Sequence, residues 1–257
     1  GKMAVSLAGM AVAFGRILHR LPPDVSFLQA VSVAGKMGKL DAVDFSFDFQ
    51  QRYTFWSGTL GGFFLALSYF GTDQSQVQRY LAGGSLAAGR FGLLFNAVLK
   101  LPMQFFILLT GVMVFIFFQF EKPPLYFNQP AYQRATQGAQ AGQLAALQTR
   151  YDAVFAQKQT EIRALTSALD AHSAPAIESA AKAVRQEQKK VEALRDEVKQ
   201  SLKVANPKSE TGDADSVFIT FVLNYLPHGL IGVFIGVIFL AALSSVSSEL
   251  SALVYTT

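Results

Sequence analysis

Four serines follow the most apolar run of this chain. The run covers residues 229–243, and Ser244, Ser245, Ser247 and Ser248 come almost directly after one another behind it. A helix of this composition belongs in a lipid bilayer, where a polar group without a partner costs free energy. The hydroxyl groups therefore need a partner, which is either a neighbouring helix or a bound cation.

A lysine stands alone in a second apolar segment. Lys100 lies two residues before Pro102, in a long helix expected from Ser85 through about Phe120. A charged side chain at membrane depth is costly, so such a residue is a functional candidate by default. The alternative is a lysine whose aliphatic stem lies along the apolar surface while its ammonium group reaches the interface.

The elements that position these residues are apolar helices. The chain has 257 residues, of which 51% are hydrophobic, and they are concentrated in 3–18, 55–70, 91–120 and 217–243. A helix needs about 20 apolar residues to span a bilayer, so the last three segments qualify and the first is short. We expect an all-α, multi-pass protein of the cell (inner) membrane.

Residues 130–205 have a different character. Apolar residues recur there at steps of three and four on both sides of a break at 173–175. This spacing predicts two amphipathic helices that form an antiparallel hairpin, a coiled-coil insertion outside the membrane. Charges of mixed sign, as in 185–190, are typical of a solvated face.

The chain is expected to have five parts, and both of its ends lie in or beside apolar segments. Three or four membrane helices can hardly bury their polar faces alone. We therefore expect an internal fragment of a longer protein, whose other helices are partners of these. The parts are the end of a transmembrane helix (1–20), a loop with a short helix capped by Ser26 (21–52), two transmembrane helices joined by a short connection at 71–84 (53–120), the helical hairpin with its linker (121–215), and a short helix followed by a transmembrane helix (216–257).

Several classes of function find no support in the sequence. The net charge is +4, but Lys and Arg beside membrane helices account for it, and no basic stripe indicates a nucleic-acid partner. The absence of cysteine excludes disulfides and thiolate metal sites. No nucleophile with a base partner, phosphate-binding glycine loop or metal-ligand cluster occurs, so we expect neither an enzyme nor a cofactor.

Four strings resemble the sodium/solute symporter family in their order and spacing. They are YTFW at 53–56, LSYFGTDQ at 67–74, QVQRYL at 76–81 and AALSS at 241–245. The first and third are similar to the iodide, monocarboxylate and vitamin carriers of the family. In contrast, residues 72–74 and Lys100 are similar to its sugar and inositol carriers.

The resemblance implies a partial LeuT-like fold of the sodium/glucose-cotransporter type. In that fold two inverted five-helix repeats surround a site in the middle of the membrane. This chain would hold the end of core helix 5 and helices 6 to 8, with the hairpin outside the common core. The connection 71–84 would be cytoplasmic, whereas the loop 21–52 and the insertion 121–215 would be extracellular or periplasmic.

The resemblance also implies a sodium site on the last helix. Sodium is a hard cation that prefers several oxygen ligands. In the family, the positions that match Ala241, Ser244 and Ser245 contribute to such a site, with a backbone carbonyl freed by a local irregularity of the helix. Further ligands would come from core helix 1. The alternative is that the serines only hydrogen-bond to a neighbouring helix, each contributing about 0.6–2 kcal/mol. Ser247 and Ser248 are expected in packing or supporting roles.

The substrate residues follow from the same resemblance. Tyr69 and Phe70 match an aromatic pair that stacks on the sugar in the sugar carriers, although Phe70 lacks the indole N–H of the usual tryptophan. The alternative is a pair of interface anchors. Lys100 matches a lysine that contacts the substrate. Asp73 and Arg79 are candidates for a gate pair, or else for a solvated charge pair.

We therefore expect a sodium-coupled secondary active symporter that works by alternating access. Its solute would be a small organic molecule, in the first place a sugar or polyol. Its partners would be sodium as coupling ion, the lipid bilayer and the remaining helices of the full-length protein. The alternatives are a monocarboxylate, vitamin or anion carrier of the same family, a sodium-sensing transporter domain attached to a signalling module, and a membrane-anchored structural or sensory protein that acts through the hairpin.

Overall fold

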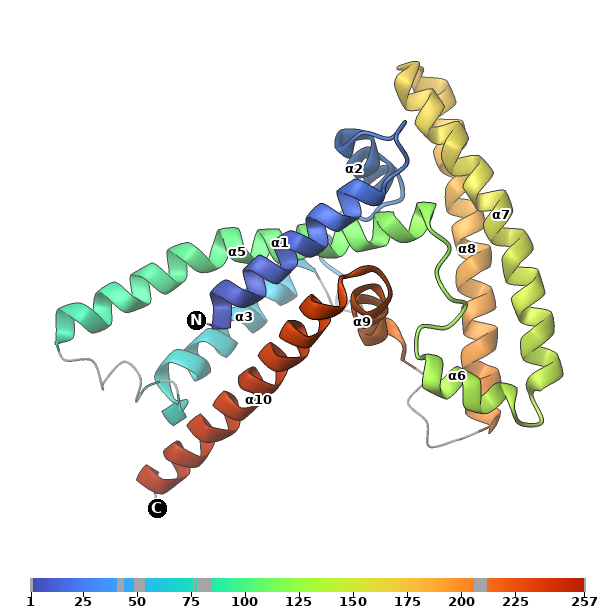
Figure 1. The fold of residues 1–257 in the computed structure, drawn as a ribbon. Coiled ribbons are helices and arrows are strands. Elements are labelled where there is room, and N and C mark those ends of the chain that lie inside the picture. The colour runs from blue at the N-terminus through green and yellow to red at the C-terminus, as the bar shows by residue number, and fades with distance from the viewer. Residues whose placement is uncertain are drawn as a thin grey trace. The chain divides into compact units, whose positions relative to one another are not determined.

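The computed structural model describes residues 2–40, 44–48, 54–75, 77, 85–205 and 212–256. All regular structure in these residues is helical, so the fold class is all-α, as predicted (Figure 1). The helices are α1 (Lys2–Arg20), α2 (Phe27–Lys36), α3 (Phe55–Gly71), α5 (Leu86–Phe120), α6 (Gln129–Thr136), α7 (Ala141–Asp170), α8 (Ala174–Ala205), α9 (Ala214–Tyr225) and α10 (His228–Thr256).

In the part of the chain that the structure describes, two helices are long and apolar enough to span a membrane, where the sequence predicted three. They are α5 over Gly89–Phe120 and α10 over His228–Val254. Helix α3 is equally apolar, but its 17 residues place it at the lower limit of a spanning helix. None of the residues of α3 is buried, and none of the apolar window of α10 is buried either. Such open apolar faces suit helices that contact lipid or further helices.

Helix ends are set by local side-chain caps. Ser26 accepts a hydrogen bond from the Gln29 N–H, while the Gln29 side chain accepts one from the Ser26 N–H, which confirms the cap predicted for the short helix in the first loop. Thr54 and Ser57 form the same reciprocal arrangement at the start of α3. Both helices therefore begin where the sequence supplies a hydroxyl.

One glycine, which the sequence did not point to, allows a close contact between two helices. A Cβ atom placed at Gly9 of α1 would lie 2.5 Å from the ring of Phe234 on α10, so a larger residue there would force that ring to shift. At Gly58, Gly61 and Gly62 of α3, a Cβ atom would meet no described atom within 4 Å. Small residues at these positions leave room for the close approach of another helix.

The chain divides into two compact units. The first comprises Gly1–Ala11, Asp41–Leu109 and Gly229–Thr257, and the second comprises Val12–Leu40 and Thr110–His228. Among the described residues, α7 and α8 contact each other extensively, and smaller contacts occur between α2 and α7 and between α6 and both hairpin helices. All of these contacts lie within the second unit.

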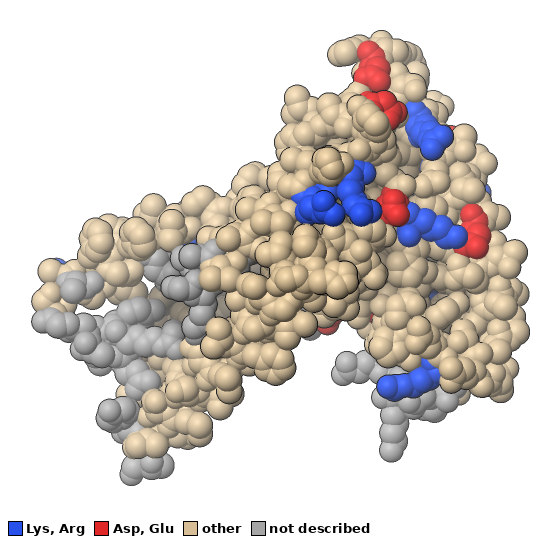
Figure 2. Space-filling model, in the orientation of Figure 1, with Lys and Arg blue, Asp and Glu red and all other residues tan. Residues whose placement is uncertain are grey.

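The predicted hairpin is formed by α7 and α8, which lie side by side and antiparallel (Figure 1). The buried positions largely match the predicted apolar stripe, and Val33 of α2 and Met37, which follows α2, add to a second cluster farther along the hairpin. On the face shown in Figure 2, charges of both signs gather over this part of the molecule, as expected for a solvated surface. The main apolar cluster comprises Leu125, Tyr126, Ala135, Leu144, Leu147, Tyr151, Phe155, Val191, Leu194, Val198 and Leu202.

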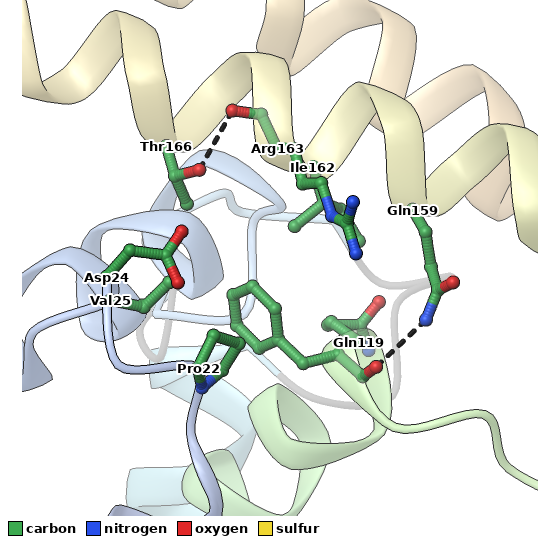
Figure 3. Close-up of a pocket in the computed structure, with 9 residues that line it drawn as sticks. Pro22, Asp24, Val25, Gln119, Gln159, Ile162, Arg163 and Thr166 are labelled. Carbon is green, nitrogen blue, oxygen red and sulfur yellow. Dashed lines mark hydrogen bonds between the residues drawn. The ribbon is translucent and has the colours of Figure 1, made fainter.

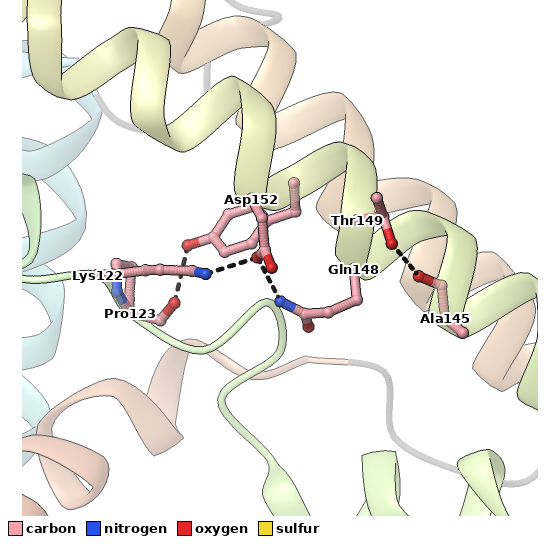
Figure 4. Close-up of polar contacts among 7 residues, drawn as sticks. Lys122, Pro123, Ala145, Gln148, Thr149 and Asp152 are labelled. Carbon is pink, nitrogen blue, oxygen red and sulfur yellow. Dashed lines mark hydrogen bonds and ion pairs between the residues drawn. The ribbon is translucent and has the colours of Figure 1, made fainter.

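The segment after α5 is tied to α7 by polar contacts (Figure 4). The Asp152 carboxylate lies 2.6 Å from the Lys122 ammonium group and accepts a second bond from Gln148 at 2.7 Å. The Tyr151 hydroxyl donates to the Pro123 carbonyl at 2.9 Å. These contacts join the end of the long apolar helix to the hairpin.

Candidate functional site

The three predicted sodium ligands share one face of α10. Ala241 precedes Ser244 by three residues and Ser245 by four, which places their side chains on neighbouring positions of the helix surface. Ser244 is half-buried and Ser245 is exposed. In the described part of the chain, neither hydroxyl takes part in a hydrogen bond with another residue, so both oxygens are available to a ligand.

The helix is regular at this point, which corrects one expectation. Helix α10 runs without a break from His228 to Thr256. The Ala241 carbonyl therefore accepts the ordinary helical bond from the Ser245 N–H. Since a carbonyl oxygen has two lone pairs, it can still contribute the second one to a cation. The three atoms form one wall of a site, with no freed carbonyl.

The same face continues to a contact with the segment that follows α3. Ser248 lies one turn beyond Ser244, and its hydroxyl donates to the Ser75 carbonyl at 3.4 Å, a long bond for a hydroxyl group. Both Ser75 and Ala252 are buried. Ser248 thus contacts the segment after α3, and its expected packing or supporting role stays a prediction. Ser75 was not singled out from the sequence, although it directly follows one of the family-like strings.

Asp73 caps the turn of helix that begins after α3. Its Oδ1 atom accepts bonds from the Ser75 N–H at 3.0 Å and from the Ser75 hydroxyl at 2.7 Å. Its backbone carbonyl accepts the Val77 N–H at 2.9 Å, as the first helical bond. Arg79 and most of the connection after Ser75 lie outside the described residues. The Asp73–Arg79 pair thus stays a prediction.

The aromatic pair lies in the last turn of α3. The rings of Tyr69 and Phe70 meet edge to face with their centroids 5.1 Å apart. Their side chains are 39% and 44% exposed. Rings this accessible can stack on a solute or anchor the helix at the membrane interface.

Lys100 is an exposed cation on α5. No described residue forms a hydrogen bond or an ion pair with it, so the structure does not join it to Tyr69, Phe70 or the serines. The sequence-predicted residues therefore form two local groups, around Ser244 and around Tyr69, and an isolated lysine.

The second unit contains a cavity of about 330 Å³ that none of the predicted site residues lines (Figure 3). Asp24 and Arg163 bring opposite charges to its wall. Gln159 donates to the Phe120 carbonyl at 2.8 Å, and Thr166 donates to the Arg163 carbonyl at 2.8 Å. A smaller cavity near Lys158 of α7 was also missed, because charges along 141–205 predicted a solvated face.

Comparison with known proteins finds relatives for part of the chain. No protein-family model and no solved structure matches it significantly. The human sodium/iodide cotransporter is 32% identical over 90 residues, which is 35% of this chain and 14% of the relative. The mouse sodium-coupled monocarboxylate transporter 2 is 33% identical over 94 residues, 36% of this chain and 15% of the relative. The rabbit sodium-dependent multivitamin transporter is 42% identical over 50 residues, 20% of this chain and 8% of the relative.

The matched region thus spans 15% or less of the length of each of these relatives. All three are sodium-coupled carriers, and none is named as an enzyme. Because all three are members of the sodium/solute symporter family, the resemblance of this chain to that family is confirmed over the matched part.

Proposed function

We propose that this chain is part of a sodium-coupled symporter that moves a small solute across a membrane by alternating access. The observation that carries the proposal is the common face of Ala241, Ser244 and Ser245 on a long apolar helix, in a chain that is similar to three sodium-coupled carriers. Two hydroxyl oxygens and one carbonyl oxygen supply part of a sodium shell, and other helices of the full-length protein complete it.

Sodium at this site favours the state that binds the solute near Tyr69, Phe70 and Lys100. The coupling is reciprocal, since each ligand raises the affinity for the other by the same factor. We place the connection 71–84 on the cytoplasmic side and the hairpin of α7 and α8 on the outer side.

The solute is, in our proposal, a small anion rather than a sugar or polyol. Two of the relatives are named for iodide and monocarboxylates and the third for vitamins, and none for a sugar. Lys100 supplies an exposed cation that no described carboxylate neutralises. An ammonium group can pair with a carboxylate or a halide at that place.

Uptake by the full-length protein in proteoliposomes tests this proposal. Iodide, lactate, biotin, glucose and inositol are offered in separate assays, each with sodium or choline outside. We expect sodium-dependent uptake of at least one of the first three. Uptake of glucose or inositol alone would overturn the anion assignment, and equal uptake in choline would overturn sodium coupling.

Deletion of the hairpin distinguishes the proposed transporter from the alternative, a protein that acts through its outer domain. Residues 140–199 are replaced by a short Gly/Ser linker, which can close the gap because both cut points lie at the same end of the antiparallel pair. We expect most of the transport to remain, since none of the residues proposed to bind sodium or the transported solute lies on α7 or α8. Uptake is normalised to the amount of protein in the membrane. Complete loss at equal abundance would favour the structural or sensory alternative.

Substitutions of Asp73 distinguish a role as a helix cap from a role in a gate pair with Arg79. Asp73→Asn keeps a side-chain oxygen that can accept the Ser75 bonds but removes the charge, whereas Asp73→Ala removes both. A cap is worth about 0.5–2 kcal/mol, so we expect near-normal uptake for the asparagine variant and reduced uptake for the alanine variant. Equal loss in both variants would instead support a charge pair with Arg79.

A further inference from the structure

A lysine is buried inside the hairpin unit. Lys158 of α7 is only 2% exposed, and its ammonium group donates to Oε1 of Gln188 on α8 at 2.6 Å. No carboxylate among the described residues forms an ion pair with it. Burying a cation without a counter-charge is unfavourable. Burial, with Arg195 as the next cause, lowers the pKa of Lys158 to about 7.

Arg195, a second cation close to Lys158, has a hydrogen-bond donor without an acceptor. The guanidinium of Arg195 lies 4.8 Å from the ring centroid of Phe127, and its Nη2 atom donates to the Pro124 carbonyl at 3.2 Å. Its Nε–H is buried and has no hydrogen-bond partner in the described structure. Buried donors in native proteins are nearly always paired, so an unpaired one calls for a ligand or an ordered water.

Lys158 and Arg195 line the same cavity of about 170 Å³. Aromatic rings of Phe118, Phe127 and Phe155 form apolar walls, and Gln119 and Gln188 provide polar ones. The space holds several water-sized volumes of about 30 Å³ each. It is smaller than the pockets of about 300–1,000 Å³ that bind drug-sized molecules.

The charges that act on the Lys158 ammonium group are positive on balance. Arg195 and Lys39 oppose its protonated form, and Glu192 favours it. Glu192 is also engaged by the Nε2 atom of Gln188, at 2.8 Å. An anion in the cavity would neutralise this excess and would give the Arg195 Nε–H an acceptor.

We propose that this cavity binds a small carboxylate such as acetate. One carboxylate oxygen accepts from Arg195 and the other from Lys158, in the charge-assisted geometry that makes such bonds strong. The short apolar tail of the ligand contacts the phenylalanine rings. The site lies in the hairpin unit and does not depend on the transport function proposed for the rest of the chain.

The site is tested by binding ¹³C-labelled acetate to the full chain in detergent at pH 6.5. Binding is measured as broadening of the acetate NMR line. Acetamide is the neutral control of the same shape. The variants are Lys158→Met, which keeps the length of the side chain without its charge, and the matched control Lys189→Met, an exposed lysine of α8. Far-UV circular dichroism verifies that both fold.

We expect wild type and Lys189→Met to bind acetate and not acetamide. Lys158→Met should bind acetate at least about tenfold more weakly than wild type. Affinity should fall above about pH 7, where Lys158 in its surroundings of Arg195, Lys39 and Glu192 loses its proton. Three results would overturn the proposal: no acetate binding by wild type in the millimolar range, equal binding of acetamide, or unchanged affinity in Lys158→Met. A water molecule alone in the cavity would give the first of these.

Discussion

Replacing Ser245 by alanine in the full-length protein is expected to raise the sodium concentration needed for half-maximal uptake by about 10- to 100-fold. The substitution removes one of the three oxygens that α10 presents on one face. In an apolar surrounding no bulk water replaces the lost ligand. The measurement is initial uptake against sodium concentration at a constant solute concentration.

A neighbouring serine gives the matched control. Ser247 lies two positions beyond Ser245, roughly on the opposite side of the helix from that residue, and its carbonyl accepts the Ser251 hydroxyl within α10. Ser247→Ala should leave the sodium dependence unchanged, whereas Ser244→Ala should weaken it as Ser245→Ala does. An unchanged sodium dependence in Ser245→Ala would end the assignment of this site.

The alternative role of these serines makes a different prediction. If they only hydrogen-bond to a neighbouring helix, each alanine variant loses about 0.6–2 kcal/mol of stability. The protein would then be less abundant or would melt at a lower temperature. The sodium concentration for half-maximal uptake would stay the same, because no ligand has been removed.

Local signals predicted the helices well. The three- and four-residue spacing of 144–198 anticipated a hairpin whose main cluster includes Leu144, Tyr151 and Val198. The hydroxyl of Ser26 anticipated the start of α2. These features depend on residues within a turn or two of one another, so a single sequence contains them. Helix α3 shows the limit, because its 17 residues are strongly apolar but barely long enough to span a bilayer.

Features that depend on distant residues were not predicted. The charges of α7 indicated a solvated face, yet Lys158 is buried because the pairing of α7 with α8 places Gln188 beside it. The expected irregularity at Ala241 is likewise missing from α10. The spacing in the sequence is enough to predict that Ala241, Ser244 and Ser245 share one face of a helix. Whether Lys100 meets Tyr69 depends on helix packing, which periodicity does not encode.

Replacing Tyr151 by alanine is expected to destabilise the hairpin by about 3–5 kcal/mol, the usual cost of deleting a buried aromatic side chain. Tyr151 is fully buried, its ring centroid lies 5.9 Å from that of Phe155, and it belongs to the main apolar cluster. Its hydroxyl also holds the Pro123 carbonyl at 2.9 Å. One residue thus joins the core of α7 to the segment that leaves α5.

Three variants separate these contributions. Tyr151→Phe keeps the ring and loses the hydrogen bond, so a loss of about 1 kcal/mol is expected. Thr149→Ala changes an exposed position of the same helix, where substitutions stay within about 0.5 kcal/mol. Limited proteolysis of the full chain during a thermal ramp, with cleavage sites mapped by mass spectrometry, reports on the hairpin itself. If Tyr151→Ala resists cleavage as well as Thr149→Ala does, then the cluster around Tyr151 does not hold the hairpin together, and its stability must come from the second cluster formed with α2.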